Sequence, residues 1–147
     1  MPGYFKIKGI DRIIDANINR AKEGLRVCEE ITRFILDSRS LTAALKNIRH
    51  TIDSLSRSLT QNKNLLKARE SRKDIGKNIY INELKRRGVK DVFFANCQRV
   101  KESIRVMEEF SKLKNKATAL KFKNLRYALY EIEKKAAGKI ASLRYYR

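Results

Sequence analysis

The feature that most constrains the fold of this chain is an internal repeat. Residues 15–31 recur, with substitutions, at residues 94–110, and both copies carry the pattern A-N-x-x-R-x-K-E-x-x-R-V-x-E-E. A second pair of segments, residues 45–50 and 122–127, follows in the same order and shares the pattern K-N-x-R. Two matched segments in one order predict a duplicated unit of helix, turn and helix.

Apolar residues recur at intervals of three, four or seven positions along four stretches of the chain. This spacing predicts amphipathic helices over about residues 11–36, 39–60, 90–113 and 116–137. Residues suited to helix ends stand at the boundaries, with Asp11, Ser38 and Asn115 as N-caps and Gly138 as the last stop. The predicted fold class is therefore all-α, a four-helix bundle built from two duplicated hairpins.

The length of 147 residues fits a single helical domain. We divide it into a first hairpin, an asymmetric linker, a second hairpin and a basic tail, at residues 10–60, 61–89, 90–138 and 139–147. The linker has no counterpart in the repeat, and we expect it to be a loop with a short helical turn near 82–87. Connections this long are unusual in a compact bundle and are often functional.

The charge balance bears on the partners of the chain. Lys and Arg number 35 against 16 Asp and Glu, which gives a net charge of +19. Such a field attracts polyanions and phosphorylated small molecules, although a lysine-rich solvated surface explains many of these charges equally well. No apolar run is long enough to cross a membrane, and the start of the chain lacks a secretory signal. With only two cysteines, this predicts a cytoplasmic protein.

Polar residues of the repeat fall inside or at the edge of the apolar helix faces, where an unpaired polar group is costly. They are Asn17 and Arg20 beside Gly24 in the first copy, and Asn96, Arg99 and Ser103 in the second. Glu23 and Glu102 follow each arginine by three residues and are within its reach on the same helix. One interpretation is that Arg20 and Arg99 form buried ion pairs that fix how the hairpins dock. The other is a polar cleft between the hairpins, in which the two guanidinium groups bind phosphate oxygens.

The linker is a source of asymmetry, which a site for one asymmetric substrate needs. Ser71 and Asp74 are candidates to hold a phosphate or a metal ion, Arg69 to bind an anion, and Gly76 to allow close backbone approach. A solvated basic loop is the alternative interpretation, since no glycine-rich phosphate-binding motif is present.

The repeated A-N-x-x-R-x-x-E, combined with R-x-S-x-x-D-x-G at residues 69–76, resembles a known family. This family is the α-helical domain found ahead of thiamine-phosphate synthase in some bacteria, described as a hydroxymethylpyrimidine phosphate kinase. The resemblance implies transfer of the γ-phosphoryl group of ATP to hydroxymethylpyrimidine phosphate, giving the diphosphate used in thiamine biosynthesis. It implies ATP and Mg²⁺ as cofactors, and as partners a small phosphorylated pyrimidine, a nucleotide and thiamine-phosphate synthase.

The positions that match this family form the predicted site. By the resemblance they are Asn17, Arg20, Glu23, Arg49, His50, Arg69, Ser71, Asp74, Asn96, Arg99 and Glu102. Their individual roles are our own inference: Arg20 and Arg99 clamp phosphates from opposite hairpins, and Asp74 holds Mg²⁺ or orients the acceptor phosphate. The other residues, with Gly76, are expected to bind substrate or phosphate.

Two other functions remain open at this point. One is a non-catalytic accessory domain of a thiamine-phosphate synthase, and the other is a basic helical nucleic-acid-binding module, which lacks a recognised motif. No synthase domain follows Arg147, so we expect a stand-alone protein or a part of a fusion. The sequence also leaves a homodimer open.

Overall fold

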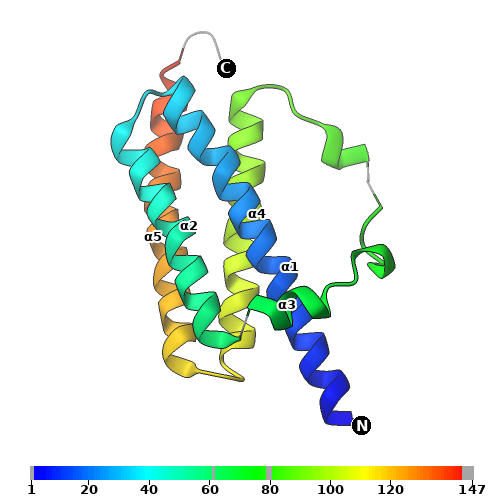
Figure 1. Cartoon of the computed structure of the whole chain (residues 1–147). Helices are drawn as coiled ribbons and strands as arrows, with labels where there is room; N and C mark the ends of the chain where they lie inside the picture. The colour runs from blue at the N-terminus through cyan, green and yellow to red at the C-terminus, as the bar shows by residue number, and fades with distance from the viewer. Residues whose placement is uncertain (1, 61, 79–80, 144–147) are drawn as a thin grey trace.

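The computed structural model describes residues 2–60, 62–78 and 81–143, and its regular structure in these ranges is entirely helical. Four long helices form a bundle: α1 (Pro2–Glu30), α2 (Arg39–Leu59), α4 (Val89–Ser111) and α5 (Lys116–Ala141) (Figure 1). A short helix, α3 (Asn62–Ala68), packs on α1. The all-α fold predicted from the apolar spacing is confirmed.

The core forms where the apolar stripes of the four long helices meet. Its largest fully buried side chains include Leu25 of α1, Leu45 of α2, Phe93 of α4 and Phe122 of α5. Each such side chain contributes about 1.5–3 kcal/mol relative to its exposed state. Burial on all four helices explains why the hydrophobic spacing in the sequence predicts their positions well.

The helix ends agree with the predictions in part. Ser38 and Asn115 are N-caps, because their side chains accept the backbone N–H of Leu41 and Thr118. The prediction of Asp11 as an N-cap is wrong: α1 begins at Pro2, and the buried Asp11 carboxylate accepts a hydrogen bond from Lys114 Nζ at 3.2 Å.

The last helix also runs beyond its predicted stop. It continues past Gly138 to Ala141, because Ile140 is buried in the core and prolongs the apolar stripe. Of the predicted basic tail at 139–147, residues 144–147 lie outside the described residues.

The first hairpin turns through a widened helical segment. A π-helix at Ile31–Ile35 continues α1, and the backbone N–H of Ser38 donates to the carbonyl of Thr32 at 2.9 Å. Asp37 has a φ of 49°, a left-handed conformation that aspartate tolerates better than most residues. The single helix predicted over 11–36 is therefore an α-helix that ends in a π-helix.

The linker is more ordered than the predicted loop. It contains α3, whose Leu65 and Ala68 are buried, and single 3-10 turns at Ser71–Lys73 and Ile81–Leu84. The helical turn expected near 82–87 therefore lies slightly earlier. Figure 1 shows the segment after α3 as an open loop on the outer side of the bundle, returning to the start of α4.

Several contacts recur at equivalent places in the two hairpins. Glu29 of α1 pairs with Arg49 of α2, and Glu108 of α4 pairs with Arg126 of α5. Asn17 Nδ2 donates to the carbonyl of Ile13, and Asn96 Nδ2 donates to the carbonyl of Val92. Contacts matched in this way are what a duplicated hairpin predicts. The division of the chain into hairpins, linker and tail stays a prediction.

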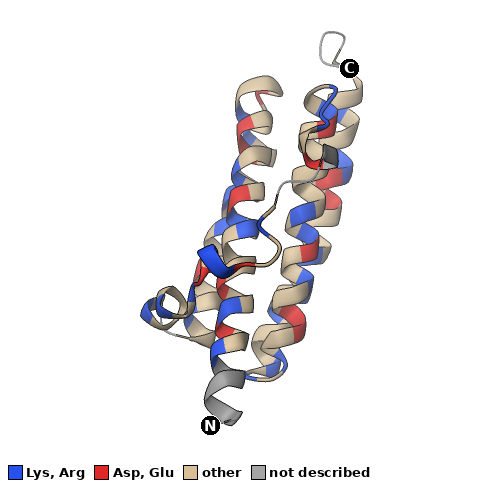
Figure 2. Ribbon diagram, turned by 90° about the vertical axis from the view of Figure 1, so that its right-hand side faces the viewer, with Lys and Arg blue, Asp and Glu red and all other residues tan. Residues whose placement is uncertain are grey.

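Charged side chains cover the outside of the bundle. Figure 2 shows Lys and Arg spread along the helices and the linker, with fewer Asp and Glu between them. In the described ranges, no helix combines the length and the apolar character that crossing a membrane requires.

Candidate functional site

A hollow of about 640 Å³ lies between α1 and the linker, and we call it the linker hollow. Its α1 wall includes Arg20 and Glu23, and its linker wall includes Arg69, Ser71 and Asp74. Five of the predicted site residues are thus brought together, although 46 to 54 positions separate the two walls in sequence. The α1 residues share one helix face because they stand at helical spacing.

Ion pairs hold the linker against α1 at this hollow. The Arg69 guanidinium donates two hydrogen bonds to the Asp15 carboxylate, both at 2.8 Å, and this contact raises the pKa of Arg69. One residue further on, Lys8 Nζ donates to Glu70 at 2.6 Å and lowers the pKa of that carboxyl. A bidentate arginine–carboxylate pair fixes orientation as well as distance. Arg69 therefore serves to position the linker.

Other polar groups of the linker hollow remain available to a ligand. Arg20 and Glu23 are exposed and form no ion pair within the described part of the chain. Ser71 and Asp74 are exposed as well, and Asp74 Oδ1 accepts the backbone N–H of Gly76 at 2.9 Å. An unpaired arginine beside a hydroxyl group is an arrangement suited to an anionic group such as phosphate.

Asp74, the predicted Mg²⁺ ligand, lies in the linker wall of this hollow. Asp74 contributes one carboxylate, and residues 2–60, 62–78 and 81–143 hold no cluster of three or more His, Cys, Asp or Glu side chains suited to a metal ion. Mg²⁺ often binds through one or two carboxylates together with the phosphates of a ligand. Asp74 fits that role only when a phosphorylated ligand supplies the other oxygens. Mg²⁺ and ATP stay predictions.

The second copy of the repeat lines a different hollow. Asn96, Arg99 and Glu102 of α4 meet Glu83 and Arg86 of the linker around a volume of about 620 Å³, the α4–linker hollow. Within the part of the chain that the structure describes, it shares no lining residue with the linker hollow. The structure therefore places Arg20 and Arg99 in two hollows rather than in one common cleft.

The alternative interpretation of the two arginines also differs from the structure. Both side chains are exposed, and neither forms an ion pair with any residue that the structure describes, so they are not buried pairs that fix docking. The asparagines of the repeat are satisfied within their own helices, because each donates to a carbonyl four residues earlier.

Four predicted site residues, all within the described ranges, line neither hollow: Asn17 of α1, Gly76 of the linker, and Arg49 and His50 of α2. Arg49 donates to the buried Glu29 carboxylate at 2.8 and 3.2 Å, which makes it a structural partner of α1. His50 is exposed on the same helix.

The predicted site left out three charged residues that line the linker hollow: Arg12, Asp15 and Glu70. A signal for Arg12 was available, since it precedes Arg20 by eight positions and so falls within about a quarter turn of it around the helix. Asp15 precedes Glu23 by the same interval. Glu70 carried no signal, because its role depends on contacts with α1.

The fold and its hollows define a helical module with an asymmetric linker and sites suited to anions. The model of the ThiD2 family matches residues 12–135, and the chain belongs to this family.

Three curated relatives carry the name "Thiamine-phosphate synthase". The protein of Synechocystis sp. (strain ATCC 27184 / PCC 6803 / Kazusa) is 38% identical over 130 residues, which cover 88% of this chain and 36% of that protein. The protein of Thermosynechococcus vestitus is 40% identical over 83% of this chain and 34% of its own length. The protein of Rhodopirellula baltica is 36% identical over 86% of this chain and 35% of its own length. The chain thus spans about a third of the length of these relatives. No solved structure matches it.

These comparisons correct the predicted activity. The resemblance implied a hydroxymethylpyrimidine phosphate kinase, and that prediction is wrong, because the relatives that match most of this chain are named as thiamine-phosphate synthases. The link to thiamine biosynthesis is confirmed. The names favour the alternative of an accessory domain over both the kinase and the nucleic-acid-binding module.

Proposed function

We propose that this chain is a non-catalytic accessory module of thiamine-phosphate synthase that holds a small phosphorylated pyrimidine in the linker hollow. The observation that carries the proposal is the similarity of more than four fifths of this chain to about a third of proteins named thiamine-phosphate synthase. About two thirds of each relative lies outside the segment shared with this chain, and we assign the synthase activity in the relatives' name to that part.

Individual arginines of the linker hollow, rather than its net charge, support a phosphorylated ligand, because, of the residues described, three arginines share the lining with the four carboxylates of Asp15, Glu23, Glu70 and Asp74. Arg20 is a cation without an ion pair in the described chain, and Arg12 stands 3.9 Å from its nearest carboxylate, Glu70. The hydroxyl of Ser71 lines the opposite wall. A phosphate group between these walls gains charge-assisted hydrogen bonds from the arginines and a further bond from the hydroxyl.

The linker hollow has room for the rest of such a ligand. Its volume of about 640 Å³ falls within the range of small-molecule sites, and Ile13 and Ala16 supply apolar surface beside the charged groups. With its flat pyrimidine ring on this apolar surface, such a ligand would place its phosphate group near Arg20.

The linker gives the two hollows different residues, and this difference decides to which hollow we assign the ligand. Arg20 and Arg99 are repeat counterparts, but the linker supplies Arg69, Ser71 and Asp74 to the first and Glu83 and Arg86 to the second. Glu102 of the second hollow also accepts a hydrogen bond from Gln98 at 2.9 Å. We therefore assign the ligand to the linker hollow.

The matched arginines allow a sharp test of the ligand. Calorimetric titration with hydroxymethylpyrimidine phosphate is expected to give a binding event that Arg20→Ala weakens at least tenfold and Arg99→Ala leaves within twofold. Equal losses in the two variants, or no binding at millimolar ligand, would contradict the assignment to this hollow.

The accessory role needs a separate measurement. The remaining two thirds of the Synechocystis relative, supplied with this chain in trans, is expected to show a lower KM for its pyrimidine substrate than without it. An unchanged KM at saturating chain would overturn the role. Incubation with ATP, Mg²⁺ and the pyrimidine phosphate is expected to release no ADP above background.

A further inference from the structure

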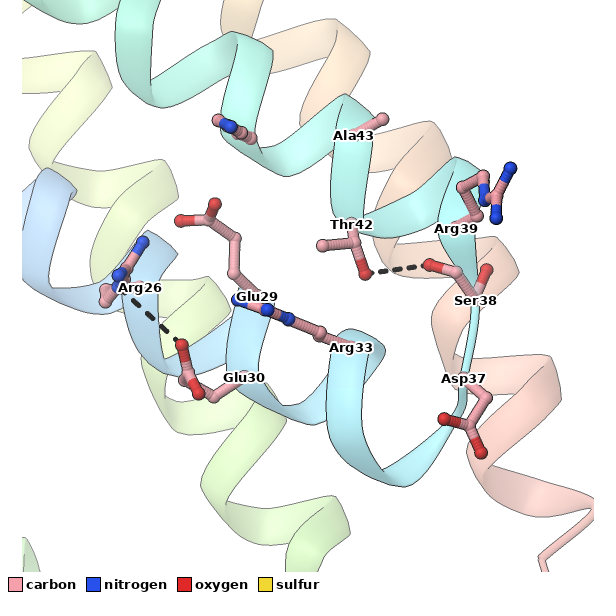
Figure 3. Close-up of a pocket in the computed structure, with 10 residues that line it drawn as sticks. Arg26, Glu29, Glu30, Arg33, Asp37, Ser38, Arg39, Thr42 and Ala43 are labelled. Carbon is pink, nitrogen blue, oxygen red and sulfur yellow. Dashed lines mark hydrogen bonds and ion pairs between the residues drawn. The ribbon is translucent and has the colours of Figure 1, made fainter.

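Two hollows at opposite ends of the bundle repeat one arrangement of cations. The α1–α2 hollow, about 530 Å³, lies between the last turns of α1 and the first turns of α2 (Figure 3). The α4–α5 hollow, about 470 Å³, lies at the corresponding turn of the second hairpin. The first is lined by Arg26, Arg33, Arg39 and Lys46. Their repeat counterparts line the second: Arg105, Lys112, Lys116 and Lys123.

A buried glutamate forms part of the lining of each hollow, and its charge is already balanced. Glu29 and Glu108 are 4% and 3% exposed. Each binds an arginine from the neighbouring helix: Arg49 donates to Glu29 at 2.8 and 3.2 Å, and Arg126 donates to Glu108 at 3.0 and 3.3 Å. The α2 and α5 cations that line the hollows are therefore not needed to neutralise these carboxylates.

The two walls of the α4–α5 hollow differ in how their cations are held. On α4, Arg105 pairs with Glu108 and Glu109 at 2.9 and 3.0 Å, and Lys112 pairs with Glu109 at 2.8 Å. On α5, Lys116 and Lys123 are exposed, and neither forms an ion pair within the described ranges. They stand seven positions apart, so they project from one side of the helix two turns apart.

The α1–α2 hollow has the same arrangement of cations, but more carboxylates line it, so its positive charge is weaker. Arg39 and Lys46 of α2 likewise form no ion pair among the described residues, and Arg26 pairs with Glu30 at 3.7 Å. Two further carboxylates, Glu30 and Asp37, line this hollow, whereas among the described residues Glu108 is the one carboxylate that lines the α4–α5 hollow.

We propose that the α4–α5 hollow binds a small anion that bears a phosphate or diphosphate group, and that the α1–α2 hollow is a weaker second site. Lysine ammonium groups and arginine forks are the side chains that bind phosphate most strongly. The volume suits a small molecule rather than a long polyanion. These sites are separate from the linker hollow and do not depend on the accessory role.

The probe is inorganic pyrophosphate, titrated into the full chain at fixed ionic strength. The test variant is the double charge reversal Lys116→Glu with Lys123→Glu. The matched control is Lys134→Glu with Lys135→Glu, exposed positions on the same helix that line neither hollow and change the net charge equally. We expect the test variant to weaken the tighter binding event at least tenfold, and the control to weaken it less than threefold.

Three results would overturn the proposal. Equal losses in the test and control variants would mean that the whole charge field attracts the anion. No measurable binding at several millimolar pyrophosphate would remove both sites. Tighter binding of a single-stranded oligonucleotide, with a steep dependence on salt, would assign the surface to nucleic acid instead. The test and control variants are compared in an Arg20→Ala background, which weakens any pyrophosphate binding in the linker hollow and so separates this test from that of the linker hollow.

Discussion

Gly24 of α1 lies directly against Val100 of α4, and the absence of a side chain at Gly24 lets the two helices pack closely there. A Cβ atom at Gly24 would stand 2.7 Å from Val100 Cγ2 and 3.0 Å from the backbone carbonyl oxygen of Asn96. The missing side chain therefore sets the separation of the two helices that carry the linker hollow and the α4–linker hollow.

Replacing this glycine with alanine is expected to destabilise the fold. Gly24→Ala forces the Val100 side chain and the α4 backbone to move, and overpacking of this kind costs about 1–3 kcal/mol, which we expect to exceed the gain of up to about 1 kcal/mol from helix propensity. The matched control is Gly138→Ala, also inside a helix, where nothing lies within 4 Å of the new Cβ. That variant is expected to gain up to about 1 kcal/mol from helix propensity. Urea unfolding measures both, and a gain in the Gly24 variant would contradict the close approach.

The Arg49–Glu29 pair leads to a second prediction. Arg49→Ala leaves a carboxylate with 5% of its side chain exposed without its bidentate partner, and loss of one member of such a pair costs on the order of 3 kcal/mol. Arg57→Ala, an exposed residue on the same helix, is expected to change the free energy of unfolding by less than about 0.5 kcal/mol. Similar losses in both variants would indicate that Glu29 finds another partner or water.

The helices and two of their N-caps could be predicted because their causes are local. Apolar spacing sets the buried stripe, and Ser38 and Asn115 cap helices through hydrogen bonds to residues three positions away. The N-cap prediction for Asp11 is wrong because its carboxylate is paired with Lys114, 103 positions later in the chain. A residue type favoured at helix starts is compatible with a helix interior when a distant cation neutralises it.

The arrangement of the site could be predicted only in part. Arg20 and Glu23 share a face of α1 by their spacing, but the linker reaches them through the Arg69–Asp15 pair, which joins residues 54 positions apart. The separation of Arg20 and Arg99 into two hollows follows from where the linker crosses each helix. Nothing in the spacing of the repeat encodes that path.

The Lys8–Glu70 contact makes the attachment of the linker depend on pH. The contact with Lys8 lowers the pKa of Glu70 below its ordinary value of 4.5. The stabilisation is therefore present above pH 4.5 and is lost as the pH falls through the lowered pKa of the folded state. We expect Glu70→Gln to remove this part of the acid dependence of hydrogen exchange in the linker.

A matched substitution separates this effect from general acid destabilisation. Glu131→Gln removes an exposed carboxylate that forms no ion pair with the described residues, and we expect it to leave the acid dependence of linker exchange unchanged. The same acid profile in wild type and Glu70→Gln would mean that the contact does not hold the linker in solution.

The two cysteines are expected to be inert in the folded protein. Cys28 and Cys97 are 1% and 0% exposed, and the neighbouring Cys28 thiol together with burial raises the pKa of Cys97. Because the thiolate is the reactive form, an aromatic disulfide reagent at pH 8 should modify neither thiol until the chain unfolds. The reaction is therefore expected to be at least a hundredfold slower in buffer than in concentrated urea. Rapid labelling of one thiol in buffer would show that the α1–α4 interface opens, and the Gly24→Ala variant should then label faster still.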